Sequence, residues 1–181
     1  MPALLTKEDG PVSVTAPHVI VTMSWEASTS DGGWRGKVAK LRGTNLDNVG
    51  ILLQGTRPVN YAGLDNLTPE DGVSHTGDTR GKKPETLTLT LAKIPEYITA
   101  VLITAVAHQP GESFRNAKNV KVKISADQEY MVQPSIVGHD NFLAVARLTR
   151  TGTGWQLSVV DEHRSYRQGD RDELVSSAMG M

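Results

Sequence analysis

The sequence predicts a mainly β protein, an antiparallel β-sandwich with long acidic loops and a short C-terminal helix. Residues 86–91 alternate threonine with leucine, and residues 119–124 place Val120, Val122 and Ile124 on one face. A period of two is typical of a strand with one buried face. Several such short segments with turn residues between them are typical of antiparallel sandwiches.

Further segments rich in β-branched and other apolar residues predict the remaining strands. They are His18–Trp25, Val49–Gln54, Ile98–His108, Glu129–Gln133, Asn141–Arg150 and Trp155–Asp161. A glycine-containing connection at residues 151–154 joins the last two and suits a hairpin. Trp25 and Trp155 follow the strand pattern and are expected in the core. A sandwich is preferred to a barrel because the strands contain few glycines for sharp corners.

Helix is expected in two short segments. Ala92–Tyr97 predicts one helical turn, and Arg171–Met179 predicts a C-terminal helix. Asp170 is expected to cap this helix, with Glu173 in the capping-box position. The chain is expected to form one domain over residues 1–181, with loose ends at residues 1–10 and 180–181.

Composition excludes several classes of protein. The chain has 181 residues and no cysteine, which excludes disulfides and thiolate metal sites and favours a reducing compartment. A net charge of -1 lacks the basic footprint that nucleic-acid binding needs. Residues 1–15 lack a signal-peptide pattern, and the apolar stretch at 97–107 is too short to span a bilayer. We therefore expect a cytoplasmic protein without integral membrane association or nucleic-acid binding.

Two long polar stretches, Ser28–Thr44 and Thr56–Pro84, are expected to carry function, because long loops in compact domains are commonly functional. Oxygen-bearing side chains are concentrated in and around the second stretch: Asn45, Asp47, Asp65, Asn66, Glu70, Asp71, Asp78 and Glu85. Such oxygens are the ligands that calcium prefers. The same residue types are also ordinary in turns, so composition leaves a metal site and simple turn chemistry both open.

Enzyme motifs are missing from the sequence. It contains no G-x-S-x-G elbow, phosphate-binding loop, EF-hand spacing or i, i+4 histidine pair. No nucleophile, base and oxyanion donor can be grouped, so the protein is not expected to be an enzyme. His75 is expected to organise the acidic loop through hydrogen bonds. Trp34 and Arg35, in a glycine-rich loop, are the candidate contacts for a protein partner.

Two loop elements of the chain resemble motifs of a known protein family. Asn45-Leu46-Asp47 and the residues that follow look like the motif D-L-D-A-S-A-F-L-L. Residues 65–78, which end in His75-Thr76-Gly77-Asp78, resemble the motif N-Q-L…D-G-S-V-x-H-T-G-D-N. Both motifs belong to the TerD family of bacterial tellurium-resistance and stress proteins, and strand similarities follow in the family's order over most of the chain. The chain is therefore identified as a divergent member.

The resemblance implies a β-sandwich with calcium bound by acidic loops, and a non-catalytic role in stress response or tellurium resistance. The implied ligands are Asp47, Asp65, Asp78 and Glu85, with Asn45 assisting. At three places the chain departs from the family pattern: Asn45 replaces an aspartate, Thr79 replaces an asparagine, and Gly81-Lys82-Lys83-Pro84-Glu85 shortens an acidic run.

Fewer carboxylates and two added lysines predict calcium binding that is weaker than in the full-motif family, or absent. One alternative is that Lys82 or Lys83 takes the place of the metal. In a second reading, the chain is a metal-free interaction module of the same fold, which uses Trp34 and the loops against a protein partner. A third, a metal-assisted hydrolase, is the least supported.

Overall fold

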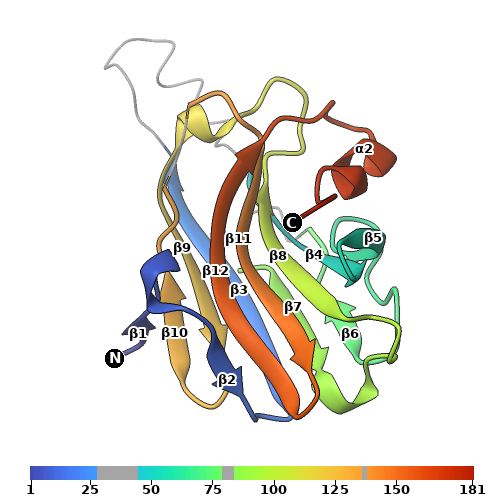
Figure 1. The fold of residues 1–181 in the computed structure, drawn as a ribbon. Coiled ribbons are helices and arrows are strands. Elements are labelled where there is room, and N and C mark those ends of the chain that lie inside the picture. The colour runs from blue at the N-terminus through green and yellow to red at the C-terminus, as the bar shows by residue number, and fades with distance from the viewer. Residues whose placement is uncertain (28–44, 79–83, 136–137) are drawn as a thin grey trace.

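The computed structural model describes residues 1–27, 45–78, 84–135 and 138–181, which fold into two packed β-sheets (Figure 1). Sheet A has the strand order β1-β10-β9-β3-β7-β6, and sheet B has the order β2-β12-β11-β8-β4-β5. Strand β1 runs parallel to β10, and the other paired strands are antiparallel. The predicted β-sandwich is confirmed.

In sheet order, the strands of sheet A are Ala3–Leu4, Glu129–Val132, Ala117–Ser125, His18–Ala27, Thr86–Thr90 and Val73–His75. Those of sheet B are Val12–Val14, Gly154–Arg164, Phe142–Thr151, Ala100–Val106, Asp47–Gln54 and Arg57–Ala62. The described helical segments are η1 (Lys7–Asp9), η2 (Leu91–Lys93), η3 (Phe114–Asn116) and α2 (Arg171–Ser176). None of these helices is long and apolar enough to cross a membrane.

The alternating strands bury one face each, as their sequences predict. In β7, Leu87 and Leu89 are fully buried in the core between the sheets, while the threonines between them are partly exposed. Trp155 is buried and Trp25 packs against the same core, which confirms both core predictions.

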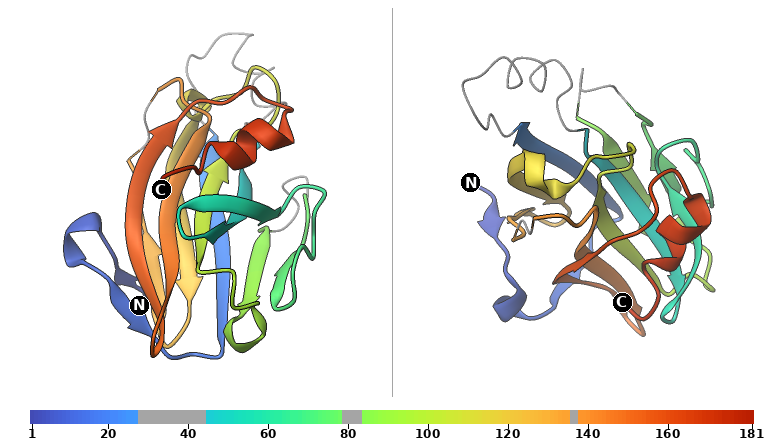
Figure 2. Two further views of the ribbon diagram at one scale, coloured as in Figure 1. Left: turned by 45° about the vertical axis from the view of Figure 1, so that its right-hand side comes forward. Right: turned by 90° about the horizontal axis from the view of Figure 1, so that it is seen from above.

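The centre of sheet B is buried on both faces. Every residue of β8 is buried, because helix α2 and the residues after it cover the outer face of this sheet (Figure 2). Leu174, Ala178 and Met181 pack there against apolar residues of β4, β8 and β11. The continuous apolar run of β8 is therefore a consequence of two cores, one on each side of the sheet.

Helix α2 begins as predicted and ends early. The carboxylate of Asp170 accepts a hydrogen bond from the backbone N–H of Glu173 at 3.0 Å, which confirms the N-cap. The helix ends at Ser176, ahead of the predicted Met179. The guanidinium of Arg164 donates to the carbonyls of Ser177 and Met179 and so fixes the turns that follow.

Two strands, β5 and β6, lie inside the stretch predicted to be irregular. Pro58 and partial exposure hide the pattern of β5, which is an edge strand. Its outer edge is covered by side chains: Asn60 Oδ1 accepts from the N–H of Tyr61, and Asn66 Nδ2 donates to the carbonyl of Tyr61. These bonds use the groups to which another strand would pair.

The N-terminal segment spans the opposite side of the sandwich. Strand β1 pairs with β10 of sheet A, and β2 pairs with β12 of sheet B. Residues 1–10, expected to be loose, contain β1, η1 and the buried Leu5, whose N–H donates to the carbonyl of Met131 at 2.9 Å. Met181 at the other end is also buried. The predicted contacts Trp34 and Arg35 lie outside the described residues, as do Thr79, Lys82 and Lys83.

Candidate metal centre

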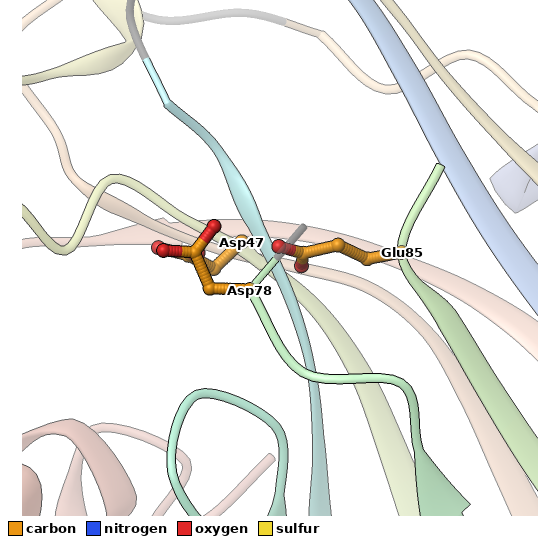
Figure 3. Close-up of side chains that lie close together, drawn as sticks. All are labelled: Asp47, Asp78 and Glu85. Atoms are coloured by element: carbon orange, nitrogen blue, oxygen red, sulfur yellow. The ribbon is translucent and has the colours of Figure 1, made fainter. Parts of the chain in front are cut away.

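Three carboxylates from different parts of the chain meet at one end of the sandwich. One carboxylate oxygen from each of Asp47, Asp78 and Glu85 lies within 4.8 Å of the others (Figure 3). Asp47 opens β4 of sheet B, Asp78 follows β6, and Glu85 immediately precedes β7 of sheet A. Asp47 and Glu85 are only 3% and 6% exposed, whereas Asp78 is exposed. The group therefore has a buried side and an open side.

A close approach between the two sheets brings Glu85 to Asp47. Gly50 of β4 faces Leu87 of β7, and a Cβ at Gly50 would lie 2.7 Å from a methyl carbon of Leu87. Only glycine allows this separation without displacing Leu87. The backbone N–H of Asn48 then donates to Glu85 Oε2 at 3.1 Å, which links β4 directly to the start of β7.

Asp78 is positioned by the turn that precedes it. The N–H of Gly77, a residue with a φ of +79°, donates to Nδ1 of His75 at 2.9 Å. An imidazole that accepts at Nδ1 is neutral and carries its proton at Nε2, and burial accordingly lowers the pKa of His75. Thr76 closes the same turn, since its N–H donates to the carbonyl of Thr86 at 3.0 Å. The predicted loop-organising role of His75 is confirmed.

The protonation of Asp47 reflects this crowding of acids. Burial raises the pKa of Asp47 to about 8, and the negative charges of Glu85, Asp78 and Glu112 add to the effect. The positive charge of Arg171 opposes it. Three carboxylates this close cannot all be ionised without strong repulsion unless a cation neutralises them.

Asn45 and Glu112 flank the group. Asn45 Nδ2 donates to Asp47 Oδ1 at 3.3 Å, and the backbone N–H of Asn45 donates to Glu112 Oε2 at 3.2 Å. Burial raises the pKa of Glu112, and the bond from Asn45 partly offsets that effect. Sequence reasoning missed Glu112, because it lies 65 positions after Asp47 in a segment without a recognisable motif.

Asp65, the fourth carboxylate implied by the resemblance, is not a member of the group. It is exposed, accepts a hydrogen bond from the hydroxyl of Tyr61 at 2.8 Å, and pairs with Nε of Arg171 at 3.3 Å. The bond from Tyr61 lowers the pKa of Asp65, and Arg171 contributes to the same shift. Asp65 thus contacts helix α2 through Arg171 and does not join the acidic group.

A polar cluster connects α2 to the acidic group. Nδ1 of His108 lies 2.7 Å from the hydroxyl of Tyr166, and the guanidinium of Arg171 contacts the imidazole of His108. Burial and the charge of Arg171 both lower the pKa of His108. Burial raises the pKa of Tyr166, and the charge of Asp47 raises it further. Sequence reasoning missed this cluster as well, because it forms only when α2 docks on sheet B.

The donor set suits a hard cation. The group offers carboxylate oxygens with an amide side chain beside them, and it contains no sulfur or imidazole ligand. Calcium takes six to eight oxygen ligands in flexible geometry, and carboxylates bind it through one or both oxygens. Asp47, Asp78 and Glu85 are therefore the residues that would hold such an ion, with Asn45 positioned by its contact to Asp47.

Comparisons with known proteins agree with this architecture. The family model of the TerD domain matches residues 5–174. The crystal structure of a homologue of the telluride resistance protein TerD from Streptomyces coelicolor A3(2) is 20% identical, with a TM-score of 0.64, and the match covers 92% of this chain and 97% of that one.

A solved structure of a protein of unknown function is 16% identical, with a TM-score of 0.63, and the match covers 92% of this chain and 99% of that one. Similarity at this level of identity shows the shared fold. No curated protein sequence matches the chain significantly.

Proposed function

The chain belongs to the TerD domain family, and from this premise we propose that it is a stress-response or tellurium-resistance protein that binds calcium. The ion is held by Asp47, Asp78 and Glu85. The protein acts by binding rather than by catalysis, in the bacterial cytoplasm and with protein partners. The observation that carries this proposal is the meeting of three carboxylates, two of them buried, within 4.8 Å.

Electrostatics supports a cation at this position. Burying carboxylates beside one another costs free energy, because each loses its hydration and repels the others. A divalent ion removes that repulsion and supplies the missing counter-charge. The side chain of Asp78 is exposed, so one of the three carboxylates is in contact with solvent and can meet an ion there.

The surroundings favour binding over catalysis. Both buried histidines make structural contacts: His75 accepts from the N–H of Gly77, and His108 contacts Tyr166 and Arg171. An acid–base catalyst needs a group that can reach a substrate proton. These two imidazoles are committed to holding the turn and helix α2.

A metal-free interaction module is the second candidate, and Arg171 favours it. The positive charge of Arg171 offsets part of the repulsion among the acids without a metal ion. The raised pKa of Asp47 also favours its neutral form, which removes one of the three negative charges. In this case the group would be a structural polar cluster without an ion. The two candidates differ in their response to calcium.

Thermal unfolding of the metal-stripped protein, with and without calcium, distinguishes them. Calcium at about 100 times its dissociation constant adds about 2.7 kcal/mol to the free energy of unfolding. For a domain of this size the midpoint then rises by roughly 5–11 °C. Magnesium should give a smaller shift, because it requires stricter octahedral geometry.

Asp78→Asn is the informative variant, since the exposed side chain can change without disturbing the core. We expect it to fold and to lose most of the calcium shift, whereas the matched control Glu96→Gln, at an exposed site in the turn before β8, keeps the shift. If wild type shows no shift at saturating calcium, the calcium proposal is wrong and the metal-free module is favoured.

A further inference from the structure

A cavity of about 440 Å³ lies between edge strand β5 and helix α2, on the outer side of sheet B. Figure 2 shows these two elements facing each other. The lining residues come from both elements and the turns after α2, and those used below are Arg57, Val59, Arg171, Asp172, Val175 and Met179. The volume is in the range of small-molecule sites, about 300–1,000 Å³.

Two guanidinium groups line this cavity. Arg57 is exposed, and no hydrogen bond or ion pair joins its side chain to another residue within the described ranges. Arg171 contacts His108 and pairs with Asp65, and the side chains of Arg171 and Asp65 are 32% and 66% exposed. Ion pairs with an exposed partner are worth only about 0–1 kcal/mol, so an incoming anion can compete with Asp65 for the guanidinium, which keeps its contact with His108.

Apolar side chains contribute one part of the remaining lining, which also contains polar residues. Val59 is 38% exposed and Met179 is 50% exposed, although both are large hydrophobic side chains, and Val175 lines the same cavity. Exposed apolar residues that gather in a concave site with a few polar groups are typical of ligand sites. A ligand that fits must therefore carry both an anionic head and an apolar body.

At Tyr61, the outer edge of β5 is closed to an added strand. Strand addition needs free N–H and C=O groups on the outer edge of β5. The N–H of Tyr61 already donates to Asn60, and its carbonyl accepts from Asn66. Recognition in this cavity thus depends on side chains.

We propose that the cavity between β5 and α2 binds a small organic anion, with its carboxylate or phosphate head between Arg57 and Arg171 and its apolar body against Val59, Val175 and Met179. Arginine binds both kinds of head through paired N–H donors. Asp172 lines the same cavity and weakens the attraction for the head. This site is distinct from the proposed calcium centre, although Arg171, which lines the cavity, also acts electrostatically on Asp47.

Isothermal titration calorimetry on the full chain tests the proposal with phenyl phosphate and benzoate as probes. Inorganic phosphate lacks the apolar body and phenol lacks the charge, so both should bind at least tenfold more weakly than the better probe. The relative affinity of phenyl phosphate and benzoate identifies the preferred head group. If phenol binds as tightly as phenyl phosphate and benzoate do, the proposal is wrong.

Three variants with different expected effects on the affinity for the better probe locate the site. Arg57→Gln should weaken the better probe by roughly tenfold or more, the usual effect of losing a charge-assisted hydrogen bond. Asp172→Asn should tighten it several-fold. Arg115→Gln, a matched change at an exposed arginine outside the cavity lining, should leave it unchanged.

Unchanged thermal unfolding of each variant establishes that the fold is intact. Equal weakening by Arg57→Gln and Arg115→Gln would show attraction to overall charge, and would overturn the assignment of the cavity. Absence of saturable binding by both anionic probes would also overturn it.

Discussion

In the metal-free protein, the Asp47→Asn variant should become more stable relative to wild type as the pH rises. The same substitution should abolish the stabilisation by calcium. Burial and the neighbouring acids raise the pKa of Asp47 to about 8 in the folded state, from 3.8 in the absence of these interactions. Between these values the folded state holds a proton that the unfolded state has lost. The free energy of unfolding of wild type therefore falls as the pH rises through this window.

Each pH unit within the window changes the free energy by about 1.4 kcal/mol. From about pH 5 to pH 7, the Asp47→Asn variant should therefore gain about 3 kcal/mol relative to wild type. For a domain of this size the difference between their midpoints should widen by roughly 6–12 °C. His75 and His108 titrate as a background common to both proteins, so the difference isolates Asp47.

The assay is thermal unfolding in a chelator at several pH values, repeated with calcium. In calcium the order should reverse near neutral pH, because only wild type retains all three carboxylates. Glu96→Gln serves as the control, since this exposed glutamate lies away from the acidic group. Parallel pH profiles for wild type and Asp47→Asn in chelator would refute the reasoning, since Asp47 would then titrate alike in both states.

Three further changes test the packing around the site. Gly50→Ala places a Cβ 2.7 Å from Leu87 and should lower the free energy of unfolding in urea by about 1–3 kcal/mol. The control is Gly152→Ala, because Gly152 has open space around it. Equal stability of the two variants would contradict the close approach. Leu174→Ala should cost about 2–5 kcal/mol in the same assay, because Leu174 of α2 is fully buried against sheet B. A loss well below this would mean that α2 is weakly docked. Arg171→Met should tighten calcium binding several-fold in calorimetry at neutral pH, because it removes a positive charge that acts on Asp47, and weaker binding would contradict this.

Local sequence patterns predicted most of the fold because burial follows residue periodicity. The alternation in β7 and β9 and the cap at Asp170 each depend on residues within a few positions of one another. Strands β5 and β6 escaped prediction because they are short, lie at sheet edges and carry polar or proline residues. Their pairing depends on long-range partners, which periodicity does not reveal.

The residues of the candidate site also fall into those that the sequence indicated and those that only the folded structure reveals. Asp47, Asp78 and Glu85 were candidate ligands through the resemblance to the TerD family, and the structure brings their carboxylates together near the ends of strands from both sheets. Asp65 stands apart because its segment bends toward Tyr61 and α2. Glu112 and Arg171 could not have been found by spacing, since a late loop and the C-terminal helix carry them to the site only in the folded chain.

If both proposed ligands bind, Arg171 couples the acidic centre to the cavity beside α2. Its charge acts on Asp47, its Nε pairs with Asp65, and its side chain lines the cavity. A cation at the acidic centre reduces the negative charge that holds Arg171 and frees it to bind an anion. An anion in the cavity, in turn, neutralises a positive charge close to the cation. Because linkage is reciprocal, each ligand must strengthen the other by the same factor. A TerD domain built in this way would respond to calcium and a small organic anion together more strongly than to either one alone.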